Sequence, residues 1–354
     1  MNSSLSIRFS PPGKHFTMFD YLAGNIGGLL KKFQPWLILA LLLTSAQSPV
    51  LAAWQQQQRD IMGTRVSVEL WHDDSEVAAT CSARVFSEMD RIDALMSTYR
   101  DSSEVSYINR NASIEAVSVS EELLYLLQRS IHFSEISAGA FDITYASIGY
   151  AYDYRKQQKP SDQVVTQKLP AIDYRHIELS DRKIRFNNSA VRIDLGGIAK
   201  GYAVDRAIDI LQRCGISRAM VSAGGDSRII GDREGRPWVI GIRHPRDPQG
   251  IALRLPISDS AISTSGDYER FYIENGERVH HIINPRTGRS AGGSWSATVT
   301  GPDAMTTDAL STTIFILGAI EGLVLVESLD EIDAIIIDSN GKVHYSSGFQ
   351  EPEN

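Results

Sequence analysis

Residues 194–205 read DLGGIAKGYAVD and predict a turn from a strand into a helix. The strand, residues 192–194, leads into two glycines, and Lys200 falls in the first turn of the helix. Such a turn exposes backbone N–H groups and the positive end of the helix dipole, which suits an anion such as a pyrophosphate. The glycines lack the spacing of a dinucleotide fingerprint or a P-loop, so the stretch taken alone also fits an ordinary chain reversal.

A second polar pair occurs far downstream. Asp308 and Thr312 are four residues apart in the segment 303–317, which predicts a helix. Residues at this spacing share one helix face, so two oxygens converge there. Hard oxygen ligands beside a phosphate cradle indicate a magnesium–phosphoanhydride site. The alternatives are a solvated helix face and, for Thr312, a hydroxyl bonded to its own backbone. Asp303 follows Pro302 and is expected to cap the helix.

Composition excludes some classes of protein. The chain has 354 residues, 42% of them hydrophobic, and a net charge of −8. This is long enough for one large or two modest domains. The acidic balance, without a basic face carrying aromatics, argues against a nucleic-acid partner.

The N-terminal segment has the order of an export signal. Two lysines, Lys31 and Lys32, precede the apolar run 36–43, and small residues extend to Ala53. This pattern predicts a secretory signal cleaved after Ala52 or Ala53, or retained as an anchor at the inner membrane. We therefore expect residues 1–53 to be an N-terminal extension with a signal, 54–345 the folded domain and 346–354 a tail, in an exported, periplasmic protein.

Cys81 and Cys214 are the only cysteines in the chain. Cys81 lies inside the folded region, so a lipid anchor on an N-terminal cysteine is not expected. An exported chain could join the two cysteines, but both fall on predicted helices at an unknown separation. We expect two buried free thiols.

The periodicity predicts an α+β protein without a regular βαβ repeat. Strands are expected at 65–70, 177–179, 183–186, 191–194, 218–221, 228–231, 238–243 and 334–338; helices at 75–99, 120–138, 303–317 and 320–328; and a polar loop at 152–170. Val66, Val68 and Leu70 alternate and should share one face of a strand.

Eight segments, in order, carry a more specific signal. They are 62–64; 96–100 with Ser103, Glu104 and Asn109; 139–144; 194–202; 222–226; 263–270; 281–288; and the Asp308/Thr312 helix. Together they resemble the FAD:protein FMN transferase family, often called ApbE, over roughly residues 61–338. The resemblance implies a two-lobed, T-fold-like α+β architecture with the flavin in the cleft between the lobes.

The resemblance also implies roles for individual residues. Mg²⁺ would be bound by Asp308, Thr312 and the backbone carbonyl of Gly197. FAD would contact Met62, Tyr99, Ala140, Phe141, Asp142, Asp194, Lys200 and Ile283. His281 and Asp267 would serve the chemistry.

Each role has a physical basis and a plainer alternative. Lys200 would neutralise a phosphate, and because cations are disfavoured at a helix N-terminus we expect an anion beside it. Tyr99 or Phe141 could stack on a ring, although Phe141 and Met62 could equally be core residues. His281 could position phosphate or take a proton from the acceptor, whereas a strand histidine bonded to a carbonyl is the alternative.

Two departures from the family pattern stand out. Asn284 replaces the usual aspartate, which puts any acid–base role of that carboxylate in doubt. Residues 149–154, GYAYDY, replace an apolar run ending in Trp-Gly-Phe-Gly, and this difference would reshape the flavin pocket or the acceptor entrance.

These observations predict Mg²⁺-dependent transfer of FMN from FAD to a Ser or Thr hydroxyl of an acceptor flavoprotein, with release of AMP. The family's acceptors carry a motif like D-x-x-[ST]-G-A-T, which this chain lacks. The alternatives are an FAD pyrophosphatase, in which water replaces the acceptor, and a periplasmic carrier that binds FAD without cleaving it. A nicotinamide oxidoreductase is disfavoured because the glycine fingerprint is missing.

Overall fold

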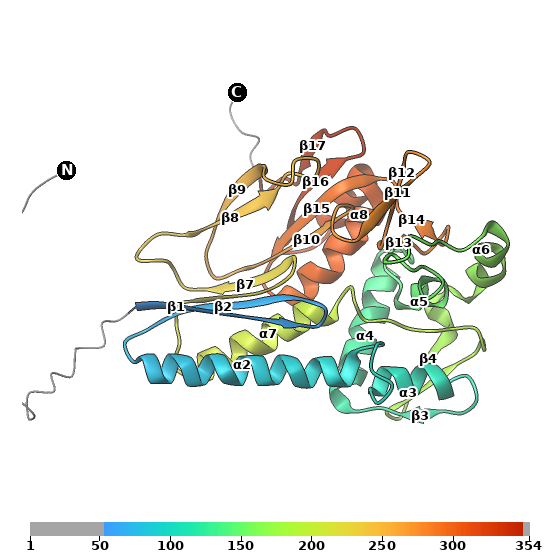
Figure 1. Ribbon diagram of the computed structural model, residues 1–354, viewed down its shortest axis with the longest axis horizontal. Coiled ribbons are helices and arrows are strands. Elements are labelled where there is room, and N and C mark those ends of the chain that lie inside the picture. Colours follow the sequence, from blue (N-terminus) through green and yellow to red (C-terminus); the bar gives the residue numbers. More distant parts are fainter. Residues whose placement is uncertain (1–52, 350–354) are drawn as a thin grey trace, which may run out of the picture. The chain divides into compact units, whose positions relative to one another are not determined.

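An eight-stranded antiparallel sheet forms the centre of the computed structural model, which describes residues 53–349 (Figure 1). The strands follow the order β1-β2-β6-β7-β10-β15-β16-β17. Their bounds are β1 (Ala53–Ile61), β2 (Thr64–His72), β6 (Ala219–Ala223), β7 (Asp226–Ile230), β10 (Ala261–Gly266), β15 (Ser294–Gly301), β16 (Asp333–Asp338) and β17 (Val343–Tyr345). The predicted signal segment lies outside the described residues, apart from Ala53 at the start of β1.

Three long helices, α2 (Ser75–Met96), α7 (Ala199–Arg213) and α8 (Ala304–Val326), cover one face of this sheet. The predicted alternation in β2 is confirmed, because Val66, Val68 and Leu70 are all fully buried in the core beneath these helices. Among the described residues, α8 alone is long and apolar enough to cross a membrane. Half of it is buried within the fold, as is typical of a core helix.

The smaller elements gather around this central layer. They are α3 (Glu104–Asn111), α4 (Glu121–Ile136), η1 (Ile143–Tyr145), α5 (Ala146–Gly149), α6 (Asp162–Lys168), η2 (Leu169–Ala171), η3 (Tyr174–His176), a sheet of β3 (Val117–Ser118), β5 (Lys183–Phe186) and β4 (Ile177–Ser180), and the hairpins β8 (Trp238–Arg243)–β9 (Ile251–Ile257), β11 (Phe271–Glu274)–β12 (Glu277–His280) and β13 (Ile283–Asn284)–β14 (Arg289–Ser290). Helices α3 to α6 and the three-stranded sheet lie at one end of the molecule in Figure 1.

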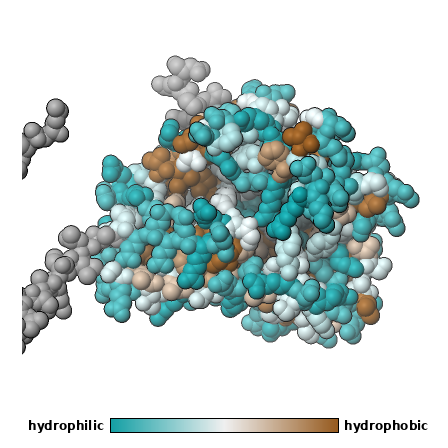
Figure 2. Space-filling model, in the orientation of Figure 1, coloured by the Kyte–Doolittle hydropathy of each residue, from teal (hydrophilic) through white to brown (hydrophobic). Residues whose placement is uncertain are grey.

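The β8–β9 hairpin covers part of the other face of the main sheet. Its Trp238 and Ile257 pack on Ile229 and Ile262. Val239, in contrast, is 62% exposed, and Figure 2 shows an apolar patch over this hairpin on an otherwise mostly hydrophilic surface. The predicted α+β class is confirmed, and the described residues belong to one compact unit. A division into two lobes stays a prediction.

The predicted strand at 192–194 is wrong. The Asn109 amide bonds both main-chain groups of Ile193, with Ile193 N–H donating to Oδ1 at 2.8 Å and Nδ2 donating to the carbonyl at 2.8 Å. Asp194 N–H donates to the carbonyl of Ile143 at 3.0 Å. The extended chain is therefore held by a side chain and by the short helix η1 rather than by a neighbouring strand.

One further prediction needs correction, because the expected loop at 152–170 contains α6, whose N-terminus is capped by Ser161 and whose Val165 is buried. The two helices expected at 303–317 and 320–328 are confirmed, because non-helical backbone at Gly318, with a φ of 78°, divides α8 in two. Asp303 caps α8 as predicted, accepting from the Thr306 N–H at 2.8 Å.

The start of α7 lies very close to the start of α8. A Cβ atom built on Gly201 would lie 2.1 Å from the carbonyl oxygen of Ala304 and 2.8 Å from Cβ of Asp308. Because the first of these atoms belongs to the backbone, it cannot turn aside as a flexible side chain could. Only glycine at position 201 allows the two helices to come this close.

Each of these helices supplies a carboxylate to the N-terminus of the other. Asp308 of α8 accepts from the Gly201 N–H at 3.0 Å, where α7 has no side-chain cap of its own. Asp205 of α7 accepts from the N–H groups of Ala304 and Met305, each at 2.9 Å. The first N–H groups of a helix need such partners, and a carboxylate there also opposes the positive end of the helix dipole. This reciprocal capping fixes α7 against α8.

The expected free thiols are also wrong. Cys81 of α2 and Cys214, at the C-terminal end of α7, form a disulfide with Cα atoms 6.3 Å apart. Packing of α2 against α7 brings together two residues that are 133 positions apart in the sequence. Sequence patterns contain no information on the distance between the two cysteines in space, so only the helix packing reveals the disulfide.

We expect Gly201→Ala to lower the free energy of unfolding by about 1–3 kcal/mol, because the added methyl group must push α7 away from α8. Urea denaturation would measure the change. Gly292→Ala is the matched control, since a Cβ there meets no atom within 4 Å. Equal stability of the two variants would contradict the close contact between the helices.

We expect Cys81→Ser with Cys214→Ser to reduce stability by about 2–4 kcal/mol, because the unfolded chain loses a constraint across a long loop. Thermal unfolding with and without a thiol reductant would test this. The reductant should destabilise the wild-type chain and leave the double variant unchanged. A wild-type protein with two titratable thiols before reduction would rule out the disulfide.

Candidate active site

Lys200 lies between two buried carboxylates. Its Nζ donates to Oδ2 of Asp226 and lies 3.3 and 3.4 Å from Oδ1 and Oδ2 of Asp308. Asp226 begins β7, directly after the Gly224-Gly225 turn of the β6–β7 hairpin, and Gly224 has a φ of +66°. The anion expected beside Lys200 at the start of the helix is therefore supplied by the protein itself.

This group carries an imbalance of charge. Burial raises the pKa of Asp308 to about 7, and the neighbouring Asp226 charge adds to the effect, which outweighs the opposing influence of Lys200. Burial alone would lower the pKa of Lys200, but the two carboxylates more than offset it, so the pKa is raised and the ammonium stays charged. With both carboxylates ionised, one lysine leaves one net negative charge, which favours binding of a further cation.

Thr312 is held at the same place by strand β10. Its Oγ1 lies 3.1 Å from Oγ of Ser265, which is also 2.9 Å from Oγ of Ser311. A Cβ built on Gly197 would lie 3.7 Å from Oγ1 of Thr312 and 3.2 Å from the Phe141 ring. The structure thus brings the Gly197 main chain next to Thr312, one turn of α8 beyond Asp308.

These three residues fit Mg²⁺. A carboxylate, a hydroxyl and a backbone carbonyl are hard oxygen donors, and magnesium accepts few protein ligands because water and phosphate oxygens complete its shell. The excess of carboxylates over cations in the group of Lys200, Asp226 and Asp308 supports this assignment. Within the described chain, no cluster of three or more His, Cys, Asp or Glu residues offers a denser metal site.

Asp194 lies at the start of the glycine turn, in a polar and aromatic environment. Its carboxylate accepts from the Gly196 N–H at 2.7 Å and from the Thr98 hydroxyl at 2.9 Å. Burial raises the pKa of Tyr150 to about 12, with a smaller contribution from the charge of Asp194. Nearby in the sequence, Tyr99 is 90% exposed, so its ring is free to stack on a planar ligand.

His281 differs from its neighbour His280. The ring of His280 is buried, with Nε2 2.7 Å from the carbonyl of Ala291 and Nδ1 accepting from the Ile282 N–H at 3.3 Å. His281 is partly exposed as a residue, but its Nδ1 is enclosed and has no hydrogen-bond partner. Burial lowers the pKa of His281 to about 3, with Arg270, His280 and Lys200 contributing in the same direction. The ring is neutral at physiological pH and has an unused nitrogen.

Two predicted residues, Asp142 and Asp267, have their carboxylates bonded within the protein. Asp142 accepts from Thr144 and from the Tyr174 N–H, and its burial raises its pKa. Asp267 forms a two-pronged ion pair with Arg246, each N···O distance being 2.7 Å. Nothing places this carboxylate against Lys200 or Asp308, so its catalytic role stays a prediction.

The remaining predicted FAD residues divide into buried and accessible groups. Ala140 and Phe141 are buried, and Phe141 packs on Phe133 with ring centroids 6.0 Å apart. Ile283 is buried in a cluster with Ile148 and Val165. Met62 is partly exposed in the β1–β2 turn and has a φ of 55°.

Sequence reasoning missed Asp226, Thr98 and Ser265 as contributors to the site. All three lie in the segments that carried the family resemblance, which was the available signal. Their partners are 26, 96 and 47 residues away, at Lys200, Asp194 and Thr312. Pairings over such separations are decided by packing and leave no local pattern.

The two departures from the family pattern have clear local roles. Asn284 accepts from the Arg286 N–H at 2.9 Å and so holds the turn before β14. The Tyr154 hydroxyl donates to the carbonyl of His280 at 3.2 Å, and that of Tyr152 donates to Gly288 at 2.9 Å. The tyrosine-rich segment therefore contacts the chain on both sides of His281.

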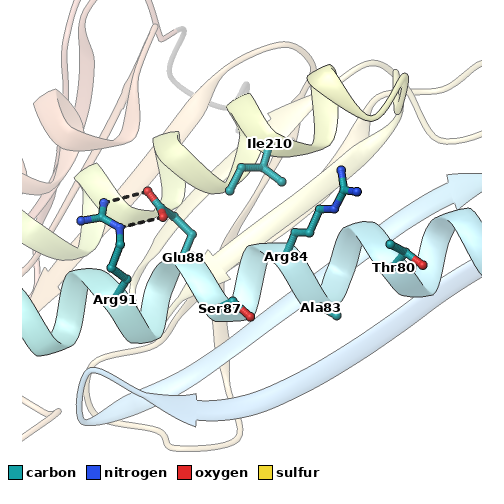
Figure 3. A pocket seen from close by; sticks show the side chains of 7 residues that line it. All are labelled: Thr80, Ala83, Arg84, Ser87, Glu88, Arg91 and Ile210. Atoms are coloured by element: carbon teal, nitrogen blue, oxygen red, sulfur yellow. Dashed lines mark hydrogen bonds and ion pairs between the residues drawn. The ribbon is translucent and has the colours of Figure 1, made fainter.

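A separate shallow groove of about 570 Å³ runs between α2 and α7 (Figure 3). It is lined by Thr80, Ala83, Arg84, Ser87, Glu88, Arg91 and Ile210. Arg91 and Glu88 form an ion pair of 2.8 Å along its wall. None of the residues predicted to bind FAD or metal lines this groove.

The fold and site define an α+β protein with a buried lysine–carboxylate centre beside oxygen donors for a metal. The sequence model of the ApbE family matches residues 62–336, and this chain belongs to that family. The resemblance expected from the eight segments is therefore confirmed.

Individual proteins of the same family are similar to this chain in sequence and in structure. A FAD:protein FMN transferase of Vibrio cholerae is 31% identical over 330 residues, spanning 89% of this chain and 98% of the relative. One of Haemophilus influenzae is 30% identical over 334 residues, spanning 88% and 96%. The crystal structure of the ApbE protein of Thermotoga maritima matches with a TM-score of 0.77 and 33% identity, covering 84% of this chain and 98% of that one. The flavin transferase ApbE of V. cholerae matches with a TM-score of 0.74 and 28% identity, covering 84% and 99%.

We expect Lys200→Met to destabilise the fold by about 3–5 kcal/mol, because it leaves two buried carboxylates without their cation. Adding Asp226→Asn to this variant should recover part of the loss by removing one of the charges. Chemical denaturation of the wild type, the two single variants and the double variant would measure this. Additive effects of the two substitutions would show that Lys200 and Asp226 do not interact.

Proposed function

We propose that this chain, a transferase of the ApbE family, moves FMN from FAD onto a Ser or Thr hydroxyl of an acceptor flavoprotein, in a Mg²⁺-dependent reaction that releases AMP. Two observations support the proposal: the Gly197 main chain packs against Thr312, one turn of α8 beyond Asp308, and Lys200 faces two buried carboxylates. Binding a flavin alone would not require such a centre, which disfavours a simple carrier.

The reaction joins the acceptor oxygen to the FMN-side phosphorus and breaks the bond from that phosphorus to the oxygen of AMP. The acceptor hydroxyl loses its proton, and AMP leaves with the bridging oxygen. Such a transfer depends mainly on alignment and on compensation of phosphate charge.

The residues of this chain can be given parts in the reaction. Asp308, Thr312 and the carbonyl of Gly197 would hold Mg²⁺, which when bound neutralises charge on the phosphate oxygens. Asp194 would accept hydrogen bonds from the ribose or ring of FAD, and the exposed Tyr99 would stack on its flavin. His281 would hold the acceptor hydroxyl and receive its proton, for which its pKa must rise from about 3 when the anionic diphosphate binds beside it.

We also propose an exported, periplasmic protein whose acceptor carries a D-x-x-[ST]-G-A-T-like motif. The Cys81–Cys214 disulfide supports this location, because such bonds form and persist in oxidising compartments.

The direct test is to incubate the purified chain with FAD, Mg²⁺ and a protein carrying the acceptor motif, and then to measure AMP and protein-bound flavin fluorescence on a denaturing gel. Equal amounts of AMP and covalent flavin are expected. Free FMN with AMP but no labelled acceptor would indicate hydrolysis of FAD. Intact bound FAD would contradict both reactions.

We expect Asp308→Asn to reduce FAD cleavage at least about a hundredfold while flavin binding persists, because the variant loses the charged ligand for Mg²⁺. Asp303→Asn is the matched control on the same helix, since asparagine also caps helices well. AMP release at saturating FAD and increasing Mg²⁺ would distinguish the two variants. Undiminished turnover by Asp308→Asn would disprove the metal assignment.

A further inference from the structure

Arg270 is an exposed cation next to His281, and it forms no ion pair with any residue that the structure describes. One of its terminal nitrogens, Nη2, donates to the carbonyl of Gly63 at 3.0 Å. No carboxylate lies within 4.0 Å of its guanidinium in the part of the chain that the structure describes. A guanidinium has five N–H donors, so most of its hydrogen-bonding capacity remains available.

Arg270 joins two segments that the sequence assigned to the site. Its main-chain carbonyl accepts from the His281 N–H at 3.1 Å, one position beyond the Phe271–His280 pair of the β11–β12 ladder. Residues that face each other across antiparallel strands project to the same side, which places Arg270 beside His281. Its guanidinium reaches the Met62-Gly63 turn between β1 and β2.

A further cation would compensate charge at the site. Lys200 is already committed to Asp226 and Asp308, and with both carboxylates ionised these three groups carry one net negative charge. A divalent metal and the diphosphate of FAD would cancel each other, so the negative charge would remain. Arg270 would balance it, and the unpartnered Nδ1 of the adjacent His281 indicates that a ligand belongs here.

We propose that Arg270, rather than Lys200, is the side chain that binds the diphosphate of FAD. This inference rests on the proposed function and adds a substrate contact to it. Planar guanidinium groups bind phosphate oxygens through two parallel hydrogen bonds, whereas a lysine between two carboxylates has little charge to offer.

A purely structural role makes a different prediction. If Arg270 only supports the Met62-Gly63 turn, its loss should disturb contacts with the flavin ring and weaken every flavin equally. If Arg270 binds the diphosphate, only ligands that carry phosphate should be affected. FAD and riboflavin share the ring system, whereas only FAD carries the diphosphate and its adenosine, so comparing them separates a contact with that part of FAD from support of the ring site.

The experiment measures binding of FAD and riboflavin to the full chain by flavin fluorescence, in EDTA so that no FAD is consumed. Arg270→Gln should weaken FAD binding about tenfold or more and leave riboflavin binding unchanged. Arg270→Lys should recover part of the loss, because the positive charge remains but the two parallel N–H donors of the guanidinium are missing. Arg213→Gln, at the far end of α7, makes the same change of charge and should alter neither affinity.

The outcomes separate this inference from the proposed function. Equal weakening of FAD and riboflavin, or no change in either, would overturn the role of Arg270 even if the wild-type chain transfers FMN. A selective loss of FAD binding supports that role, even if the wild-type chain labels no acceptor and the proposed transfer is thereby refuted. Unfolding curves of the variants should overlap that of the wild type, and Arg270→Lys provides the folded comparison if the glutamine variant is unstable.

Discussion

The reciprocal capping between α7 and α8 is the interaction on which the site depends. Asp308 bonds the Gly201 N–H, and Asp205 bonds the first N–H groups of α8. In this one contact, N–H groups at the start of each helix gain a hydrogen-bond acceptor. Gly201 allows the two backbones to come close enough for it. Because Asp308 is also a proposed metal ligand, the contact that joins the helices sets the position of the chemistry.

The same contact accounts for the electrostatics of the site. Burying Asp226 and Asp308 without a cation would be costly, and Lys200 meets that requirement inside the protein. A lysine used in this way is less available to a substrate, which is why we propose that a metal and Arg270 compensate the charge of a diphosphate. The site is thus organised before any ligand binds, and its negative charge favours the cation that a phosphate needs.

Features with a local cause could be predicted from the sequence. The alternation of Val66, Val68 and Leu70 identified the buried face of β2, and Asp303 identified the start of α8. Helical spacing paired Asp308 and Thr312, the two side chains proposed to bind the metal. The strand expected at 192–194 failed because Asn109, more than 80 residues earlier, bonds its main chain in place of a neighbouring strand.

The sequence by itself determined the α+β class, the glycine turn into α7 and the family, because periodicity, capping residues and ordered motifs are local or linear features. Only the tertiary structure decided that Cys81 bonds Cys214, that Lys200 faces two carboxylates, and that Arg270 meets none among residues 53–349. These outcomes depend on which side chains of distant segments meet when α2, α7 and the hairpins pack. The distances between these side chains cannot be derived from the order of residues in the chain. They determine the protonation state and the hydrogen-bond partners of the groups in the site.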